Sequence, residues 1–471
     1  MNPWLNPLFT LRAIKSFTFD INRLERWSKD KLTKYQNQRF KKMIQYAFSV
    51  PIYKEKYEKM NIQLKDIRKI NDIIKLPLIS KDDIRQGYPD KVIPNNFNKI
   101  KNDLAVTSGS SGSPIGLYCE PIIGIKFLSA WARILHAHNK HWLTTKTTAI
   151  LDRGVITDIE NEISRNSVRI TPSIINYRVP KYLKNVQQLN ATEPIDSLAK
   201  KIETFRPDFL IGHPGVLKAI AYLKKSDIIG KNIKPSLIAS GGGLLDKYTR
   251  KYIEESFEAS VIDVYASTEG ELTAFQCREG NYHIQSDIIY LEILDKNNMQ
   301  VDPGETGRIV VTRLYGKGTP IIRYTGLSDI AVYSKNQCNC GITSQLIEKI
   351  EGRTADCIIL PDGRVIPPYS FLGIIVDVLT LYGMEIINQF QIIQEKINKI
   401  KIMVVKNEKI LNNINLYENV INEIAFRYKK KLGDEVSISI IQVEEIKKTK
   451  KNQTIAPLII SHVVTNKPWQ N

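Results

Sequence analysis

Between about residues 104 and 270 the chain alternates short β-rich runs with helical stretches, and this pattern constrains its fold more than any other feature. The runs expected as strands are Leu104–Val106, Ala149–Leu151, Phe209–Ile211, Leu237–Ala239 and Val261–Val264. The helical stretches between some of them are 122–136, 214–224 and 245–257. Such alternation predicts an α/β fold, in which a mostly parallel sheet is flanked by helices.

The pattern changes on either side of this region. Residues 20–60 are rich in helix formers and predict long helices that end near Pro51. After residue 280, strand-like runs joined by glycine-containing turns predict a smaller β-rich subdomain. These runs are Ile288–Ile293, Arg308–Thr312 and Ile330–Tyr333.

Beyond Gly352 and Arg353 the chain predicts a compact α+β unit. Its expected elements are a hairpin, a helix and a strand, at 390–393 with 399–405, at 414–432 and at 436–443. Two domains are also what a chain of 471 residues favours. We therefore expect a large N-terminal domain over 1–353 and a small C-terminal domain over 357–471, with a hinge near 354–356.

Composition and charge exclude several classes of protein. A hydrophobic fraction of 42% and a charged fraction of 25% are typical of a folded globular chain. The net charge is +18, but the densest basic run, 447–451, has no zinc-finger, RRM-like or helix-turn-helix signature beside it. We interpret the excess as a solvated surface and expect no nucleic-acid partner.

No segment has the pattern of a secretion signal or a membrane span. Residues 1–19 mix apolar residues with Asn, Pro, Arg and Lys, and lack the apolar core of a signal peptide. No apolar stretch approaches the ~18–20 residues that cross a bilayer. We expect a cytoplasmic protein, in which five cysteines do not form a disulfide framework.

A Ser/Gly-rich segment follows the first expected strand: Thr107, Ser108, Gly109, Ser110, Ser111 and Gly112. Its glycines let backbone N–H groups approach an anion, and its hydroxyls add donors that suit nucleotide phosphates. It is not a Walker A loop, because no Gly-Lys-Ser/Thr follows at the required spacing, and it does not accommodate Gly-x-Ser-x-Gly. By itself, a segment of this composition is more often a flexible loop.

Further motifs follow in order: Ser240–Gly243, Asp263–Gly270, Gly304–Arg308, Pro320–Gly326 with Asp329, and Ile350–Asp356. The ordered set resembles the adenylate-forming superfamily, and within it the branch of phenylacetate–CoA ligases and CapK-like proteins. Shorter similarities to that branch lie at 50–53, 76–81 and 360–364. Each motif alone is weak, but their order is specific, and the resemblance spans about residues 45–460.

The resemblance implies an enzyme that uses ATP and Mg²⁺ to activate a carboxylic acid as an acyl-adenylate and then transfers the acyl group to CoA. An aromatic acid and a homodimer are the family's defaults, and the C-terminal domain would be a mobile lid that rotates about Asp356. Two alternatives stay open. One is transfer to an amine, a carrier protein or a glycan precursor, and the other is a nucleotide-binding homologue without catalysis.

At the phosphate end of the site, the resemblance implies that segment 107–112 holds the ATP phosphates. Thr268 would donate a hydrogen bond to the α-phosphate, and Glu269 would help to hold Mg²⁺, which prefers carboxylate and phosphate oxygens. Such groups are needed because the attack of a carboxylate on ATP brings two anions together. Alone, Glu269 is equally well explained as a carboxylate at the start of a helix.

At the nucleoside end, the resemblance implies that Gly241 and Gly242 belong to the nucleotide site. Tyr265 would pack against the adenine, Asp329 would accept hydrogen bonds from both ribose hydroxyls, and Arg353 would lie near the nucleotide. Taken individually, Tyr265 also fits a core position and Asp329 a turn.

The chain departs from the family near its C-terminus. The family has a Gly-Lys there whose lysine reaches the α-phosphate and the carboxylate. This chain has Asn452-Gln453 at that place, preceded by Lys450 and Lys451. A register shift would let Lys451 or Lys450 act as the catalytic lysine, and the alternative is that both are surface lysines. Smaller departures are Ala266 for a glycine and a one-residue delay of Asp329.

Three cysteines and a histidine form a second candidate site. Cys277 and His283 are followed at a distance by Cys338 and Cys340. Three thiolates and an imidazole would make a closed tetrahedral structural zinc site, and some members of the resembled branch carry a comparable one. Buried free cysteines are an equally good interpretation.

Overall fold

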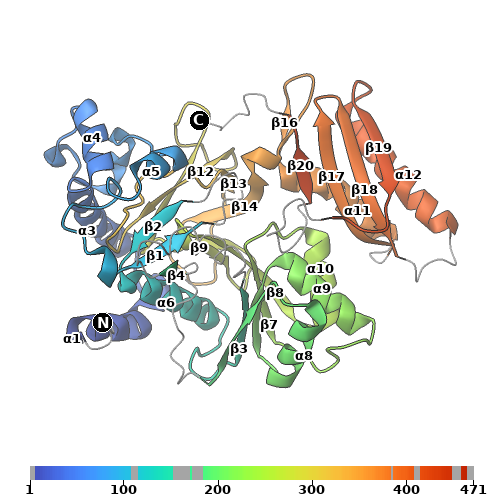
Figure 1. The fold of residues 1–471 in the computed structure, drawn as a ribbon, viewed down its shortest axis with the longest axis horizontal. Helices are drawn as coiled ribbons and strands as arrows, with labels where there is room; N and C mark the ends of the chain where they lie inside the picture. The colour runs from blue at the N-terminus through green and yellow to red at the C-terminus, as the bar shows by residue number, and fades with distance from the viewer. Residues whose placement is uncertain are drawn as a thin grey trace.

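The computed structural model describes residues 6–107, 115–151, 170–171, 184–382, 386–407, 414–447 and 458–463 (Figure 1). A large sheet with flanking helices forms the N-terminal part, and a smaller sheet with two helices forms the C-terminal part. Within the described residues, no helix is both long and apolar enough to span a membrane.

The main sheet has eleven strands in the order β11-β12-β13-β14-β10-β9-β8-β7-β6-β3-β5. Its five-stranded portion from β8 to β5 is wholly parallel. These strands are β3 (Thr147–Leu151), β5 (Val186–Asn190), β6 (Phe209–Gly212), β7 (Leu237–Gly241) and β8 (Ser260–Ser267). The predicted α/β class and the predicted strands of this region are therefore confirmed.

Helices cover both faces of the parallel portion because its strands are apolar on both faces. On one face, Leu210 and Ile238 belong to a core with α8 (Ile195–Phe205), α9 (Pro214–Lys225) and α10 (Lys247–Phe257). On the other face, Phe209 and Leu237 belong to a core with α6 (Pro121–Ala137).

The three strands predicted as a β-rich subdomain are present as β11 (Ile289–Leu294), β12 (Thr306–Arg313) and β13 (Asp329–Tyr333), but they continue this sheet as part of its antiparallel portion. That portion also contains β9 (Glu271–Gln276), β10 (Tyr282–Ile284) and β14 (Leu346–Arg353), which the sequence pattern did not indicate. Strand β8 joins the two portions, because it pairs in parallel with β7 and antiparallel with β9.

The strand expected at Leu104–Val106 is present as β1 (Asp103–Val106), but its expected place in the parallel sheet was wrong. It pairs antiparallel with β2 (Gly116–Cys119) and parallel with β4 (Ile170–Thr171) in a separate three-stranded sheet. The connection from β1 to β2 is too short for the crossover that parallel pairing requires. Thr107 donates its N–H to the Ile115 carbonyl (3.1 Å), and Ile115 donates its N–H to Thr107 Oγ1 (3.0 Å).

A series of helices forms the N-terminal region, and the long helix expected to end near Pro51 is present as the 19-residue α3 (Lys29–Ala47). Ser28 caps one of them, and Pro51 occupies the first turn of another rather than ending a helix. The helices are α1 (Pro7–Lys15), the π-helix η2 (Ser16–Asp20), α2 (Arg23–Arg26), α3 (Lys29–Ala47), α4 (Pro51–Lys59) and α5 (Lys81–Gly87), with 3₁₀ turns η3 (Leu64–Asp66), η4 (Ile70–Lys75) and η5 (Lys99–Lys101).

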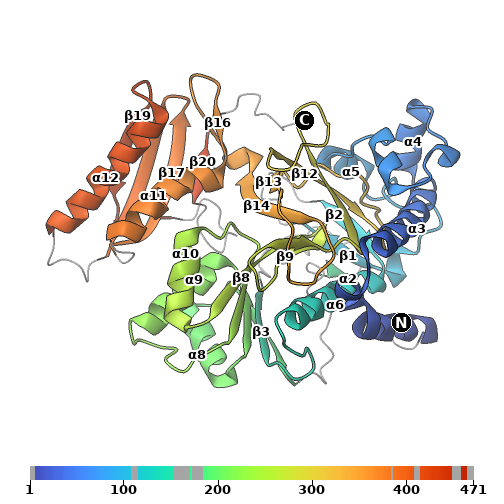
Figure 2. The same cartoon turned by 180° about the vertical axis from the view of Figure 1, so that it is seen from behind.

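The C-terminal part contains a four-stranded sheet of order β19-β18-β17-β20, with two helices on one face (Figures 1 and 2). Its predicted hairpin, helix and strand are present as β17 (Ile387–Lys396), β18 (Lys399–Lys406), α12 (Ile414–Leu432) and β19 (Ser437–Gln442). The sequence pattern did not indicate α11 (Pro368–Tyr382) or β20 (Ile459–Ser461). The turn η8 (Thr354–Asp356) and a ribbon of β15 (Ile358–Ile359) with β16 (Val365–Ile366) connect this part to β14.

Helices α9 and α10 provide the surface on which the C-terminal part rests. Tyr248 of α10 lies in the same apolar core as Phe371 of α11, and its hydroxyl donates to the Ile387 carbonyl (3.4 Å). Lys218 of α9 donates to the Asn388 carbonyl (3.3 Å), and its ammonium lies 4.4 Å from the Tyr248 ring centre.

Candidate nucleotide site and cysteine cluster

The candidate nucleotide site lies at the carboxyl ends of β7 and β8, which is where ligands of open α/β sheets bind. Strand β7 ends at Gly241, whose Cα approaches β8 so closely that a Cβ would lie 3.2 Å from the Val264 carbonyl oxygen. Gly242 follows with a φ of +78°, a conformation that favours glycine. Both motif glycines therefore let the chain turn away immediately beside β8.

Tyr265 and Asp329 meet although four strand steps separate β8 from β13. A flat sheet would place these strands about 19 Å apart, so the sheet must curl to close the distance. The Tyr265 hydroxyl donates to Asp329 Oδ2 (2.7 Å), and Arg353 Nε lies 3.7 Å from Asp329 Oδ1. Asp329 and Arg353 are also direct partners in the register of β13 and β14.

Burial dominates the electrostatics of this group. Desolvation raises the pKa of Asp329 above its ordinary value, although the Arg353 charge and the Tyr265 hydrogen bond act in the opposite direction. The site thus holds a carboxylate whose side chain is 16% exposed and can accept hydrogen bonds, as a pair of sugar hydroxyls would donate.

Glu269 is the second carboxylate of the site, and it is buried. It follows the end of β8 and accepts a hydrogen bond from the Tyr324 hydroxyl (3.0 Å). Burial raises its pKa, while the Tyr324 hydrogen bond and the positive charge of Lys81 lower it. Lys81 in turn has a pKa lowered by burial and raised by the Glu269 charge. A half-buried ammonium therefore lies close enough to the candidate Mg²⁺ ligand for the two charges to interact.

Arg323 positions the segment that carries Lys81. Its guanidinium pairs with the buried Glu292 (2.9 Å) and donates to the Leu76 carbonyl (2.7 Å). Its backbone carbonyl accepts the Ile79 N–H (3.0 Å), so the chain before α5 lies against the 320–326 motif as an added short strand. Ser80 and Asp83 then cap α5 reciprocally, and the helix begins at Lys81.

The structure brings together five of the residues implied by the resemblance: Gly241, Gly242, Tyr265, Glu269 and Asp329, with Arg353 at their edge. Thr268 is half-buried beside Glu269, and Thr107 is buried at the base of its loop. Residues 108–112 of the loop, and Lys450 and Lys451, lie outside the described residues.

Three residues with a part in this geometry received no role from the sequence: Lys81, Arg323 and Tyr324. All three belong to motifs recognised there, at 76–81 and 320–326. The signal was therefore present, but the two motifs are far apart in the chain, and only the fold brings them together.

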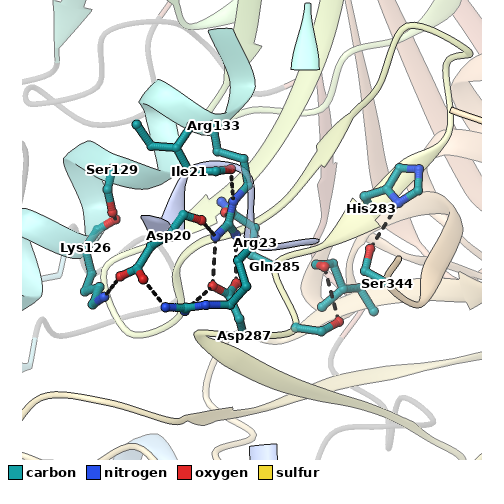
Figure 3. Close-up of polar contacts among 12 residues, drawn as sticks. Asp20, Ile21, Arg23, Lys126, Ser129, Arg133, His283, Gln285, Asp287 and Ser344 are labelled. Atoms are coloured by element: carbon teal, nitrogen blue, oxygen red, sulfur yellow. Dashed lines mark hydrogen bonds and ion pairs between the residues drawn. The ribbon is translucent and has the colours of Figure 1, made fainter. Parts of the chain in front are cut away.

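The four candidate metal ligands form one cluster. Cys277 Sγ lies 3.6 Å from Cys338 Sγ, and Cys340 Sγ lies 3.2 Å from His283 Nε2. All four ligand atoms lie within 4.8 Å of one another, and the cysteines are not in disulfides. Figure 3 shows His283 with its other ring nitrogen, Nδ1, directed at the Ser344 hydroxyl (3.0 Å).

The cluster fits a zinc ion. Sulfur ligands of a tetrahedral zinc site, at a Zn–S distance of ~2.3 Å, lie ~3.8 Å apart, close to the spacing seen here. Burial lowers the pKa of His283 to about 4, which keeps the imidazole neutral as metal binding requires. The Ser344 contact fixes the ring as partners of metal-binding histidines do.

Sequence comparison finds relatives that span most of the chain. A phenylacetate–coenzyme A ligase of Thermus thermophilus is 22% identical over 79% of this chain and 80% of its own length. Another, from Escherichia coli, is 23% identical over 73% of this chain and 76% of its own length. The protein CapK of Staphylococcus aureus is 25% identical over 73% of this chain and 72% of its own length. No protein-family model matches the chain.

Solved structures show the same fold. A 2-hydroxyisobutyryl-CoA ligase in the postadenylation state, in complex with an acyl-AMP, matches with a TM-score of 0.73 at 19% identity and covers 91% of this chain and 89% of its own. The same ligase in the thioesterification state matches with a TM-score of 0.56 at 20% identity, and the match covers 93% of this chain and 91% of its own.

The fold is that of the adenylate-forming CoA ligases. Within that class, the sequence relatives are phenylacetate–coenzyme A ligases and CapK, so the resemblance inferred from the ordered motifs is confirmed.

The raised pKa of Asp329 predicts a gain in stability for Asp329→Asn. At pH values between the ordinary and the raised pKa, the folded state binds more protons than the unfolded state. The contribution of this carboxyl to the stability of the protein therefore falls as pH rises. The neutral amide should raise the melting temperature by a few degrees at pH 8, and by less at pH 4. Glu418→Gln, at an exposed position on α12, is the matched control. A melting temperature that falls at pH 8 would contradict this account.

Metal analysis tests the cysteine cluster. The purified chain should contain about one zinc ion, and a strong chelator should lower its melting temperature, because the ion crosslinks β10 to the segment 338–340. Cys338→Ser should lose the zinc, whereas Cys119→Ala, a buried cysteine outside the cluster, should keep it. Equal zinc contents in the two variants would argue against the site.

Proposed function

We propose that this chain is an ATP-dependent acid–thiol ligase that activates a carboxylic acid as an acyl-adenylate and transfers the acyl group to CoA. The observation that carries the proposal is the meeting of Tyr265 and Asp329 at the end of β8, beside Glu269 and Lys81. This arrangement suits a nucleoside next to a phosphate-binding group. The curated relatives include phenylacetate–coenzyme A ligases, which favours an aromatic acid as the substrate.

Each residue of the site has a task in adenylation. Asp329 would accept hydrogen bonds from the ribose, Tyr265 would pack against the base, and Thr268 would bind the α-phosphate. The reaction joins the carboxylate oxygen to the α-phosphorus and releases pyrophosphate, so the approach of two anions must be offset. Glu269, with its carboxylate oxygens, would hold Mg²⁺, which supplies positive charge to the phosphates.

Lys81 is the described residue that best supplies a second positive charge. It is half-buried, the charge of Glu269 raises its pKa, and it lies on the first turn of α5. The chain lacks the family's Gly-Lys lysine near residue 453, so Lys81 would take over part of that role. Lys451 remains the alternative predicted from the sequence.

The C-terminal part would act as a lid. Apart from Tyr248 of α10, the buried residues of its apolar core begin at Ile358, which supports a boundary near 353–357 and a hinge at Asp356. The fold matches the postadenylation state of the ligase better than the thioesterification state, as expected if the same parts take up different arrangements between the half-reactions. We also propose a cytoplasmic location, while the homodimer and the absence of a nucleic-acid partner stay predictions.

Exchange of labelled pyrophosphate into ATP tests adenylation directly. An aryl acid should support exchange, and Glu269→Gln and Asp329→Asn should each reduce it by about 10²-fold or more, because they remove groups that act on the nucleotide and its metal. Glu418→Gln is the control. Added CoA should then yield an acyl-CoA. Exchange without CoA consumption would redirect the proposal to another acceptor, and no exchange across a broad panel of acids would refute it.

Comparison of Lys81→Gln with Lys451→Gln decides which lysine serves the first half-reaction. Lys81→Gln should lower the exchange rate by about 10²-fold at saturating ATP, whereas Lys451→Gln should stay within about threefold of the parent. Lys56→Gln, a nearby lysine that pairs with Asp83, controls for a general loss of charge. The reverse order of the two effects would return the role to the C-terminal lysine.

A further inference from the structure

The N-terminal helix α1 and its extension η2 carry four large apolar side chains on the outside, while Ala13 faces inward. Leu8, Leu11, Ile14 and Phe19 are 68%, 62%, 54% and 62% exposed. The polar Ser16 and Asp20 of the same segment are 1% and 2% exposed. A helix at a protein surface ordinarily shows the opposite distribution, so this inversion requires an explanation.

A buried charge cluster fixes the orientation of the segment. Asp20 at the end of η2 pairs with Arg23 and with Lys126 of α6. Arg23 and Arg133 of α6 both pair with Asp287, at 2.8 and 2.7 Å (Figure 3). Because a buried carboxylate cannot leave such a cluster without losing its partners, the polar side of the segment must face inward. The apolar side is therefore held outward.

The apolar face is also basic. Arg12 and Lys15 are exposed on α1, which has no acidic residue in its first turn. In the stretch 7–34 the exposed side chains include six cations and two anions. The cations are Arg12, Lys15, Arg26, Lys29, Lys31 and Lys34, and the anions are Glu25 and Asp30. The chain as a whole has a net charge of +18.

The size of the face restricts what can cover it. The nine residues of α1 and the five of η2 form a segment ~20 Å long and ~10 Å wide, an area well below the ~800 Å² per partner of a stable protein interface. A second copy of the chain would also bring a second set of cations to the same contact. A bilayer surface has no such minimum size, because it accepts apolar side chains at the headgroup boundary while anionic lipids attract the basic residues around them.

We propose that α1 and η2 form an anionic-membrane docking surface, with the side chains of Leu8, Leu11, Ile14 and Phe19 inserted at the headgroup boundary and Arg12 and Lys15 contacting lipid phosphates. The helix lies at the end of the molecule opposite α12 (Figures 1 and 2). Docking there leaves the C-terminal part on the far side from the bilayer. The proposal does not depend on the ligase activity.

Co-sedimentation with vesicles tests the proposal on the full chain. Binding to vesicles of phosphatidylserine and phosphatidylcholine should be strong at low salt and should fall steeply as salt increases. The double variant Leu11→Asn/Ile14→Asn should lower the partition coefficient at least about tenfold, because it removes two inserting side chains. Arg12→Gln/Lys15→Gln should lower it about fivefold per charge.

The matched control is Ile228→Asn, which removes an apolar side chain that is 57% exposed elsewhere on the surface. It should bind vesicles like the parent, and all variants should keep the parent's melting temperature, because every changed side chain is exposed. Absence of vesicle binding by the parent chain would overturn the proposal. A parent dimer in sedimentation equilibrium that becomes monomeric in Leu11→Asn/Ile14→Asn would overturn it too, by showing that a second copy covers the face.

Discussion

The double pairing of β8, parallel to β7 on one side and antiparallel to β9 on the other, is the interaction on which the rest of the structure depends. It joins a parallel sheet, which needs helices on both faces, to an antiparallel portion that can curl. The end of β8 is therefore the place where Gly241 from one portion and Asp329 from the other come near the same tyrosine. A nucleotide site at this position uses residues from both portions.

The curl of the sheet places two carboxyls in positions where burial makes their charged forms unfavourable. Asp329 and Glu269 are carboxyls whose pKa values burial raises, and each has only partial compensation from a nearby cation. Such groups reduce the stability of the folded chain, yet they are what a ribose and a metal–phosphate group require as acceptors. The rest of the sheet must therefore be stable enough to offset the free energy that these two carboxyls cost the folded state.

Buried charge plays a second part at the N-terminus. The cluster of Asp20, Arg23, Lys126, Arg133 and Asp287 connects the first helices to α6 and to the turn before β11. Because these charged groups have partners only in one arrangement, they fix how the first helices are oriented against α6, in addition to any stability they contribute. The outward apolar face of α1 follows from this arrangement.

The sequence by itself determined the α/β class, the positions of most strands between 147 and 333, the ordered motifs and the four members of the cysteine cluster. These follow from local periodicity and from residue types at fixed spacing, which neighbours along the chain decide. Only the tertiary structure decided that Leu104–Val106 belongs to a separate sheet, that Arg323 holds the segment carrying Lys81, and that α1 turns its apolar side outward. Each of these depends on pairings between residues far apart in the chain, where hydrogen bonds and buried charges override local preference.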